Sequence, residues 1–532
     1  MTEALPKWDE DADVVVVGYG FAGATAAITA HDSGAKVLLL EKAPEQYKGG
    51  NSRVSANLVF WPNDVEKAKA YFLALAGPYT DDISPAMLQA WADEMFANKA
   101  WLIGLGMTPA DLPYIEFPEM AGSDCVRVLM NGEGPVGGER LWRLIEHAVA
   151  ARPIRVQYDT PAVRLVKAGG EIVGVIAERA GQRVAIKANR AVVLTCGGFE
   201  NNPAMVRNYV SGLTEIYPHG TPYNTGDGIR MGLEVGAELW HMNNISGPLV
   251  SFKAPEIPVA QWLTLPHGKS YLFVGGDGAR FTMEGDPCVT GDFHGKVKRH
   301  GMWMQQTLPV PMHMIFDEAY RKAGRIGHAT ADWDVSHGNR YDWSDDNLRE
   351  VEKGWITKAP TLPELAKLIG VEPAALEAAV ARFNTLARSG VDSDWARGAE
   401  TLAPLDAPPY YAMALTPAFV NTQGGPRRDE NAQIIGANGH PIGRLYSAGE
   451  LGSIYSFLYQ GGGNIGECFA FGRIAGRNAA REPALGAASS APPASGQREL
   501  AHEPVLAALE DGPQGGAGAV PIGSGQRPVH FV

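Results

Sequence analysis

The chain has 532 residues, of which 45% are hydrophobic and 20% are charged, and its formal net charge is −13. This composition excludes an intrinsically disordered chain, and the length suits about two to four domains. The 46 Lys and Arg residues form no cluster, which argues against nucleic-acid binding, and glycine, with 63 residues, is the one component in clear excess.

The cysteines and the first residues bear on the cellular compartment. Four separated cysteines without a Cys-x-x-Cys pair argue against a disulfide framework, a zinc site and an iron–sulfur cluster, so we expect no metal. They are Cys125, Cys196, Cys288 and Cys468. Residues 1–13 lack the basic segment of a signal peptide, and no stretch of about 20 residues is continuously apolar. The sequence therefore predicts a cytoplasmic protein without a transmembrane segment.

Three short segments near the amino terminus predict a β-α-β unit. Asp13–Val17 and Lys36–Leu40 are apolar runs that predict buried parallel strands, and Phe21–Ser33, rich in Ala and Thr, predicts the helix between them. Apolar residues recur at helical spacing over residues 85–107 and Leu141–Ala150, where we expect two more helices.

The next segments predict several strands in succession. We expect a small sheet formed by Ile154–Tyr158, Ala162–Lys167, Ile172–Glu178 and Gln182–Ala188. A further buried strand, Ala191–Thr195, ends close to the pair Gly197-Gly198.

Composition divides the chain into four segments. A middle segment rich in Trp, His and Met indicates an inserted second domain, and the last residues, rich in Ala, Gly, Pro and Ser, indicate a tail that is helical at most over Leu500–Leu509. The predicted segments are 1–245 and 405–482, which together form one domain, the insert 246–404, and the tail 483–532. Further helices are expected at 362–369, 373–388 and 466–480.

The turn after the first strand has the pattern of a dinucleotide-binding site. Gly18 permits the tight turn, Gly20 leaves room for a pyrophosphate at the helix amino terminus, and Gly23 lets the helix approach the strand. Glu41 ends the second strand, where an acid accepts hydrogen bonds from ribose hydroxyls and repels a 2′-phosphate, so NADP is disfavoured.

The loop Gly50-Asn51-Ser52, a few residues after this acid, resembles the flavin-contacting loop of the fumarate reductase and succinate dehydrogenase flavoprotein superfamily. That superfamily includes 3-ketosteroid dehydrogenases and tricarballylate dehydrogenase. Other blocks resemble it in the same order, over roughly residues 10–480, and they are Leu194–Glu200, Thr225–Gly228, Gly275–Phe281 and the glycine blocks from Ala448 to Gly476.

The resemblance implies the fold and the cofactor. The fold is a Rossmann-like α/β FAD-binding domain with an inserted α+β substrate or cap domain. FAD is expected to bind without a covalent bond, because Gly50-Asn51-Ser52 lacks the histidine of the covalent members. The cofactor-binding residues implied are Gly18, Gly20, Phe21, Ala22, Gly23, Glu41, Lys42, Gly50, Asn51, Ser52, Val163, Cys196, Gly197, Thr225, Asp227, Gly449, Glu450, Asn464 and Ile465.

Glu450 and the start of the last predicted helix have roles that follow from their chemistry. Glu450 comes at a strand end, where a carboxylate can hold ribityl hydroxyls. The backbone N–H groups near Gly463, Asn464 and Ile465 open a helix and can stabilise negative charge on the flavin at N1 and O2.

The family moves a hydride between flavin N5 and a carbon near a carbonyl or carboxylate. Fumarate reductases hold carboxylates with His and Arg, and the resemblance places Asn421, Asn464 and Gly247-Pro248 at three of those positions. The loss of cationic donors argues against a four-carbon dicarboxylate, whereas Asn421 and Asn464 can still contact a neutral carbonyl of the substrate.

The catalytic candidates also come from the resemblance. Tyr459, before the last glycine block, and the Gly463 N–H match the oxyanion hole of ketosteroid dehydrogenases, and Tyr455 is a weaker candidate. Cys288 stands where those enzymes carry a basic Tyr, so the proton-transfer group stays open. His300, which follows Arg299, is the first choice, His294 the second, and Arg280 either delivers protons or braces its turn.

The sequence thus predicts an FAD-dependent oxidoreductase that introduces or reduces a C=C bond next to a carbonyl, on a hydrophobic or alicyclic ketone such as a 3-ketosteroid. One alternative is a fumarate reductase-like or tricarballylate dehydrogenase-like enzyme with a carboxylate substrate. Another is a flavin electron-transfer protein without turnover. No second dinucleotide motif is present, so a quinone, a dye-like acceptor or a redox protein is favoured over NAD as electron partner.

Overall fold

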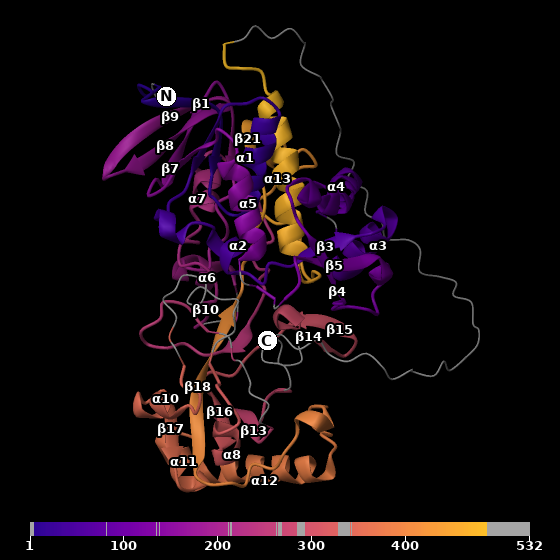
Figure 1. The fold of residues 1–532 in the computed structure, drawn as a ribbon, viewed down its shortest axis with the longest axis vertical. Coiled ribbons are helices and arrows are strands. Elements are labelled where there is room, and N and C mark those ends of the chain that lie inside the picture. The colour runs from indigo at the N-terminus through magenta and orange to yellow at the C-terminus, as the bar shows by residue number, and fades with distance from the viewer. Residues whose placement is uncertain are drawn as a thin grey trace, which may run out of the picture.

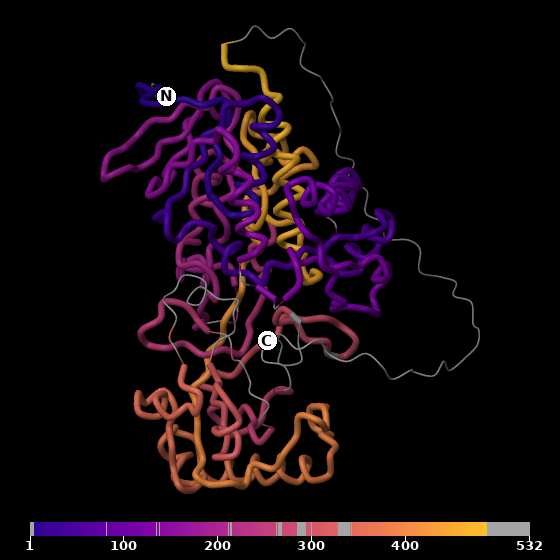
Figure 2. Tube along the Cα trace, viewed as in Figure 1, coloured from indigo at the N-terminus to yellow at the C-terminus, as the bar shows by residue number. Residues whose placement is uncertain are grey.

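The computed structural model describes residues 5–486, except residues 81, 135, 138, 211, 213–214, 262, 264–268, 285–292, 328–340 and 342. Cys288 and the helical stretch considered at Leu500–Leu509 lie outside the described residues. The described chain forms an upper body, which contains both of its ends, and a lower body at the opposite end of the long axis (Figures 1 and 2).

An eight-stranded sheet forms the centre of the upper body. Its order is β20-β21-β8-β9-β1-β2-β6, with β7 paired to β8. Strand β1 (Glu10–Val17) lies between β2 (Val37–Leu40) and β9 (Gln182–Leu194) and is parallel to both. The predicted β-α-β unit at the amino terminus is therefore present.

Two expectations about this sheet are wrong. Gln182–Ala188 and Ala191–Thr195 are one strand, because β9 continues through Asn189 and Arg190 while it pairs with β8 on one side and β1 on the other. Strands β6 to β9 also form no small sheet of their own. Since β9 carries hydrogen bonds to β1, the antiparallel strands β7 and β8 extend the central sheet. The bounds are β6 (Arg155–Gln157), β7 (Ala162–Ala168) and β8 (Glu171–Arg179).

Helices cover the two faces of the sheet. Alternate side chains of a strand point to opposite faces, so Val14 and Val16 join one apolar core and Val15 and Val17 another. Against the first face pack α1 (Phe21–Asp32), α5 (Arg140–Ala150) and α13 (Gly463–Arg481), and beside the second lie α6 (Pro203–Tyr209) and α7 (Asp227–Glu234). Helices α1 and α13 run side by side (Figure 1).

A small lobe that the sequence analysis only half predicted flanks this helix layer. Its helix α4 (Pro85–Gly104) matches the helix expected at 85–107, but α3 (Val65–Ala76) and a three-stranded antiparallel sheet were not predicted. The strands are short and lack clear alternation of apolar and polar residues, which leaves no signal to detect. They are β3 (Val59–Pro62), β4 (Pro109–Leu112) and β5 (Val126–Asn131).

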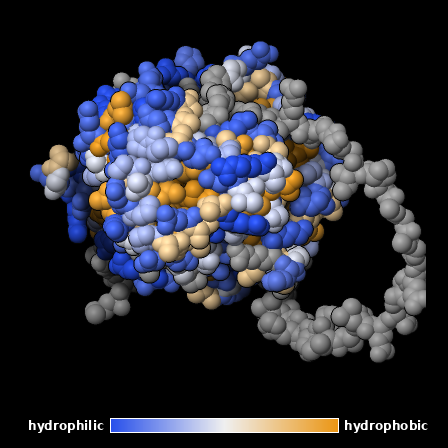
Figure 3. Space-filling model, turned by 90° about the horizontal axis from the view of Figure 1, so that it is seen from below, coloured by the Kyte–Doolittle hydropathy of each residue, from blue (hydrophilic) through white to orange (hydrophobic). Residues whose placement is uncertain are grey.

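The lower body is built on a second, six-stranded sheet. Its long strand β18 (Tyr410–Phe419) pairs with β10, β12, β16 and β17, and β16 pairs with β13. The helices α11 (Leu362–Ile369) and α12 (Pro373–Ser389) lie at the positions expected from sequence. Seen from below, the molecule shows hydrophobic and hydrophilic residues intermixed (Figure 3). The domain boundaries at 246 and 404 stay a prediction.

A β-hairpin projects from the region between the two bodies toward the small lobe (Figure 1). It consists of β14 (Lys296–Arg299) and β15 (Met302–Gln305), preceded by the short helix η3 (Phe293–Gly295).

The remaining elements are η1 (Glu45–Tyr47), α2 (Gly50–Val54), η2 (Ser123–Cys125), β10 (Tyr217–Pro218), β11 (Leu239–Trp240), β12 (Leu249–Ser251), β13 (Tyr271–Gly275), β16 (Met312–Asp317), α8 (Glu318–Arg321), α10 (Leu348–Glu352), β17 (Ile356–Ala359), η4 (Ala399–Thr401), β19 (Gly425–Pro426), β20 (Gln433–Ile435) and β21 (Pro441–Ser447).

Candidate active site

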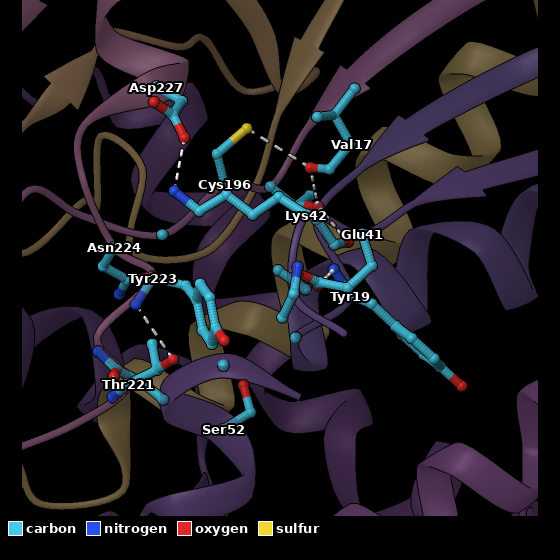
Figure 4. A pocket seen from close by; sticks show the side chains of 18 of the residues that line it. Val17, Tyr19, Glu41, Lys42, Ser52, Cys196, Thr221, Tyr223, Asn224 and Asp227 are labelled. Carbon is cyan, nitrogen blue, oxygen red and sulfur yellow. Dashed lines mark hydrogen bonds and ion pairs between the residues drawn. The ribbon is translucent and has the colours of Figure 1, made fainter. Parts of the chain in front are cut away.

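A cleft of about 820 Å³, counted to its open mouth, lies at the carboxyl ends of β1, β2 and β9. In parallel sheets this edge is where nucleotides bind. Thirteen of the residues predicted to bind the cofactor line this cleft, and they are Gly18, Gly20, Phe21, Ala22, Glu41, Lys42, Gly50, Asn51, Ser52, Cys196, Gly197, Asp227 and Glu450. Figure 4 shows Glu41, Lys42, Ser52, Cys196 and Asp227 among the residues that converge on the cleft from elements far apart in the sequence.

The glycine turn leaves no room for larger residues. Gly18 has a φ of 105°, and a Cβ on it would lie 2.4 Å from the carbonyl oxygen of Thr195. A Cβ on Gly23 would lie 1.9 Å from the carbonyl oxygen of Gly18. The backbone itself therefore forms the wall of the cleft at this turn. A pyrophosphate at the amino terminus of α1 requires this, because it must approach the backbone N–H groups closely.

The loop after the second strand is tied to this turn. The N–H of Phe21 donates to the Ser52 hydroxyl at 2.8 Å, and a Cβ on Gly20 would lie 3.1 Å from the same oxygen. Ser52 therefore satisfies one donor of α1 and draws the flavin-contacting loop against the turn.

Glu41 is held at the end of β2 by backbone donors. Its two carboxylate oxygens accept from the N–H groups of Tyr19 and Ala43, each at 2.8 Å. Burial raises the pKa of Glu41, and these two hydrogen bonds act in the opposite direction. The carboxylate lines the cleft in a fixed orientation and can accept hydroxyl donors from a ribose (Figure 4).

Lys42 and Asp227 form an ion pair across the cleft wall (Figure 4). The Lys42 ammonium lies 2.6 Å from the Asp227 carboxylate and 2.7 Å from the Thr225 hydroxyl. The pair connects the strand β2 side of the cleft to the amino terminus of α7, so the Thr-Gly-Asp-Gly block is joined to the first β-α-β unit.

Two buried carboxylates face each other at the inner end of the cleft. The Asn51 amide donates to Glu200 at 2.8 Å and to Glu450 at 3.3 Å, and the Thr422 N–H donates to Glu450 at 3.0 Å. Burial first, and then the neighbouring Glu200 charge, raise the pKa of Glu450; burial also raises the pKa of Glu200. Both shifts disfavour the ionised carboxylates, so burial and mutual repulsion act in the same direction at this end of the cleft.

The sequence places Glu200 in the Leu194–Glu200 motif and does not predict it as a site residue. Its other oxygen, Oε2, has no hydrogen-bond partner within the described residues, although the side chain is buried. Asn224 completes the cluster by donating to both carboxylates, at 3.2 and 3.5 Å. The position of Asn224, directly before the Thr-Gly-Asp-Gly block, is the sequence signal that could have identified it.

The amino terminus of α13 is linked to the same end of the cleft, because Asn464 donates to Asn421 and the neighbouring Thr422 donates to Glu450. One prediction is corrected here: the Gly463 N–H donates to the Gln460 carbonyl at 2.7 Å and is not free for a substrate oxygen. Gly462, at φ 83°, turns the chain so that this bond forms. Within the described residues the N–H groups of Asn464 and Ile465 have no such partner, so these two remain as donors toward an anion.

Three amides meet where the resemblance places a cationic clamp. Asn464 donates from its amide to Asn421 at 3.1 Å, and Gln423 donates to Asn464 at 3.2 Å. The structure therefore brings the two predicted substrate residues, Asn421 and Asn464, into one cluster. The cluster is neutral and can exchange hydrogen bonds with a carbonyl.

Tyr459 lies in a chain of polar groups drawn from distant segments. Its hydroxyl donates to the Ser246 hydroxyl at 2.9 Å, which lies 3.1 Å from Nδ1 of His294. Nε2 of His294 is 3.1 Å from Glu116, and the His294 and Tyr459 rings stack with centroids 4.1 Å apart. The structure thus brings together Tyr459 and the second-choice histidine.

The other catalytic candidates lie apart from this chain. His300 is exposed in the turn of the β14–β15 hairpin. Arg280 bonds Glu284 and Asp392 in the lower body, which supports its bracing alternative. The hydroxyl of buried Tyr455 has no hydrogen-bond partner within the described residues.

A few predicted cofactor residues do not line the cleft, and residues not predicted do. In β7 it is Ala162 that lines the cleft, whereas Val163 packs with the apolar residues on the sheet edge. Gly23, Thr225, Gly449, Asn464 and Ile465 do not line the cleft either, although Gly23, Thr225 and Gly449 contact lining residues. The lining residues that sequence analysis missed include Tyr19, Tyr47, Thr160, Thr221, Tyr223, Asn224 and Cys468.

Residues 13–465 match the FAD binding domain family, which is more than half of the chain. The chain belongs to this family. Within it, the similar proteins place the chain in the FAD-dependent succinate dehydrogenase and fumarate reductase flavoprotein superfamily. FAD is accordingly the cofactor, and the chain is an FAD-dependent oxidoreductase.

Three similar proteins of this superfamily illustrate its range. The chain is 30% identical to a fumarate reductase (cytochrome) of Shewanella frigidimarina, over 88% of this chain and 77% of that protein. It is 26% identical to a 3-oxosteroid 1-dehydrogenase of Mycobacterium tuberculosis, over 88% and 98%. It is 28% identical to an NADH:acrylate oxidoreductase of Vibrio harveyi, over 88% of this chain but 50% of that protein, so it spans half the length of this relative.

The fold of this flavoprotein agrees with that of solved structures. A 3-ketosteroid delta1-dehydrogenase from Sterolibacterium denitrificans superimposes with a TM-score of 0.70 at 23% identity, over 89% of this chain and all of that one. The predicted fold class, a Rossmann-like domain with a cap domain, is confirmed.

The lining of the cleft and the groups beside it fit FAD. The turn at Gly18 and Gly23 would be filled by any Cβ, the free N–H groups at Asn464 and Ile465 suit an anion, and the Glu200 oxygen without a partner can accept a hydroxyl. Among the described residues, no cluster of His, Cys, Asp and Glu has the composition of a metal site. No helix in the described part of the chain is both long and apolar enough to cross a membrane.

Proposed function

We propose that this flavoprotein introduces or reduces a C=C bond α,β to a carbonyl, on a hydrophobic or alicyclic ketone of the 3-ketosteroid type. The observation that carries the proposal is the amide cluster of Asn421, Gln423 and Asn464, which stands where carboxylate-specific relatives are expected to carry cations. An amide N–H can donate a hydrogen bond to a neutral carbonyl. A carboxylate would lose most of its hydration on binding and would gain only a neutral hydrogen-bond donor in return.

Different residues of the protein stabilise charge and exchange the proton. Bound FAD supplies a hydride acceptor or donor. The N–H groups of Asn464 and Ile465, at the positive end of α13, stabilise negative charge beside them. Tyr459, a neutral phenol because burial raises its pKa, exchanges a proton with the substrate.

We further propose that the cofactor is bound without a covalent bond and that its electron partner is a quinone, a dye-like acceptor or a redox protein. The support is the sequence of the loop, Gly50-Asn51-Ser52, which offers no histidine. Acid precipitation is expected to release all of the flavin into the supernatant, and flavin retained in the pellet would contradict this.

The test of the function uses the flavin as reporter. Anaerobic addition of 4-androstene-3,17-dione or another cyclic 3-ketone is expected to bleach the flavin band of the holoenzyme, and fumarate is expected to leave dithionite-reduced enzyme unchanged. Oxidation of the reduced enzyme by fumarate or acrylate, with no response to ketones, would favour the carboxylate alternative.

That alternative has one specific support. Among the three similar proteins described above, the fumarate reductase has the highest identity to this chain, 30%. A carboxylate enzyme would need a cation beside the substrate, and the asparagines at 421 and 464 provide none. We therefore place the ketone first.

A further inference from the structure

We propose that Ser246, His294 and Glu116 form a proton relay that serves Tyr459. The inference rests on the proposed function, since it gives Tyr459 the proton exchange with substrate. It replaces the exposed His300 as the source of protons and assigns roles to two residues, Ser246 and Glu116, that the motifs did not indicate.

The geometry is that of an unbroken hydrogen-bonded line. Oη of Tyr459 lies 2.9 Å from Oγ of Ser246, and Oγ of Ser246 lies 3.1 Å from Nδ1 of His294. Nε2 of His294 lies 3.1 Å from Oε2 of Glu116. Every link is within the range of a hydrogen bond, and every group in the line can both gain and lose a proton.

The line is shielded from solvent along most of its length. Ser246 is fully buried, Glu116 and Tyr459 are 5% exposed, and the His294 side chain is 18% exposed. Hydrogen bonds in such surroundings are stronger and better ordered than in water. The partly exposed imidazole is the point at which the line can exchange protons with solvent.

Glu116 is anchored as the acidic end. The N–H of Gly461 and the hydroxyl of Tyr114 both donate to its carboxylate, in addition to His294. Three donors fix the position of the carboxylate beside Nε2 of His294, and this contact selects the tautomer with its ring proton on Nε2, which leaves Nδ1 as an acceptor for Ser246. A carboxylate that orients a histidine, which acts on a hydroxyl, is the arrangement used to move protons in hydrolases.

The proton steps balance. In the dehydrogenation direction Tyr459 passes its proton to Ser246, Ser246 passes its own to Nδ1 of His294, and Tyr459 takes the α-proton of the substrate. The substrate thus loses one proton to Tyr459 and the adjacent hydrogen, with its electron pair, to the cofactor. The imidazolium of His294 is stabilised by Glu116 until the proton leaves to solvent, and reduction runs in reverse.

The other titratable groups near the line are few in the described residues. Lys296 follows His294 by two positions, and its amine bonds the Ile245 carbonyl next to Ser246. Burial lowers the pKa of Lys296 to about 7, so its charge state changes in the same pH range as that of a histidine. Lys296→Met is therefore included as a variant in any pH profile.

The first experiment measures stopped-flow reduction of the holoenzyme by 4-androstene-3,17-dione in His294→Gln, Ser246→Ala and Glu116→Gln. We expect reduction to slow by about 100-fold in His294→Gln and about 10- to 100-fold in the others, with FAD content and ketone affinity within about twofold of wild type. Imidazole is expected to restore part of the rate in His294→Gly. The matched controls, His440→Gln and Glu119→Gln, change exposed residues away from the line.

The second experiment does not depend on turnover. In ¹⁵N-histidine-labelled protein without substrate, the ring proton between His294 and Glu116 is expected to give an exchange-protected resonance. It should vanish in His294→Gln and shift in Ser246→Ala. This readout separates the relay from the proposed function, because it stands even if no ketone reduces the wild-type flavin.

Four results would overturn the relay, and the first three concern His294 and the FAD content. They are a His294→Gln enzyme that keeps more than about one third of the wild-type rate, a loss of rate that only parallels a loss of FAD, and the absence of a protected His294 proton in the wild-type protein. A larger loss in His300→Gln than in His294→Gln would also overturn it, by assigning the proton step to the hairpin turn.

Discussion

The nucleotide end of the cleft and the Tyr459 relay are assembled in opposite ways. At the nucleotide end, Gly18, Gly20, Gly23, Glu41 and Ser52 lie within 35 residues of one another in the chain. The relay takes Glu116, Ser246, His294 and Tyr459 from four segments that span most of the sequence.

The difference reflects what each end must do. The nucleotide end offers backbone N–H groups and space, which one strand-turn-helix unit can supply by itself. The relay needs side chains of defined protonation at hydrogen-bond distance, which requires the small lobe, the β14–β15 hairpin and the loop before α13 to meet (Figure 1). One end therefore depends on local geometry, and the other on packing between distant elements.

The largest effect is expected from a substitution that disrupts only the nucleotide end of the cleft. Gly23→Val places a Cβ within 1.9 Å of the Gly18 carbonyl oxygen. We expect protein purified without flavin absorbance and a loss of about 1–3 kcal/mol in the free energy of unfolding. Gly104→Ala, where no atom lies within 4 Å of the added Cβ, is the control and should bind FAD normally. Full flavin content in Gly23→Val would refute the close approach.

The next largest effect is expected from a substitution that disrupts the relay and leaves the nucleotide end intact. Tyr459→Phe removes the hydroxyl that exchanges the proton, and flavin reduction by the ketone should slow by about 100-fold or more at unchanged FAD content. Stopped-flow absorbance measures both quantities. Tyr79→Phe, on a half-exposed tyrosine, is the control. Equal rates in the two variants would exclude Tyr459 from the chemistry.

A smaller effect tests the charge balance beside the relay. Lys296 has a pKa of about 7 in the folded protein, below its unfolded value, because burial penalises the ammonium. As the pH falls from about 10.5 to 7, the unfolded chain takes up a proton that the folded one does not, so stability decreases over that window. Lys296→Met should remove this loss and raise the free energy of unfolding at pH 7 by roughly 1–3 kcal/mol. Urea unfolding from pH 7 to pH 10 measures it; parallel curves would contradict the prediction.

The smallest effect concerns the carboxylate pair between the two ends. The pKa of Glu200 is raised by burial, so the folded protein keeps a proton that the unfolded chain loses above its ordinary pKa of 4.5. Stability contributed by this proton is present below pH 4.5 and is lost as the pH rises toward the folded pKa. Glu200→Gln should flatten this decline, by about 1 kcal/mol at pH 8, in thermal unfolding of the cofactor-free protein. Glu377→Gln, an exposed glutamate on α12, should follow the wild type.

Local elements and elements that depend on distant partners also differ in how well the sequence predicts them. The β-α-β unit, α4, α5, α11, α12 and α13 were predicted from periodicity and composition, because their signals lie within one window. The β3–β5 sheet and α3 were missed, and β9 was split in two, since strand pairing is decided by neighbours distant in sequence. The Gly463 N–H was assigned to substrate because a motif does not record that the preceding turn already uses it.

The sequence by itself determined a dinucleotide-binding turn, because the glycine positions and the acid at the end of β2 specify it through local backbone geometry, and the resemblance of the loop Gly50-Asn51-Ser52 implied that the dinucleotide is FAD. It also determined that the usual cationic clamp is absent at Asn421 and Asn464. Only the tertiary structure decided which histidine stands behind Tyr459. His294 directly precedes the β14–β15 hairpin and His300 lies in its turn, six residues later, and no local pattern distinguishes them. The contacts of His294 with Ser246 and Glu116, which come from other segments, distinguish it from His300. Proton transfer depends on distances between groups, and only packing sets those distances.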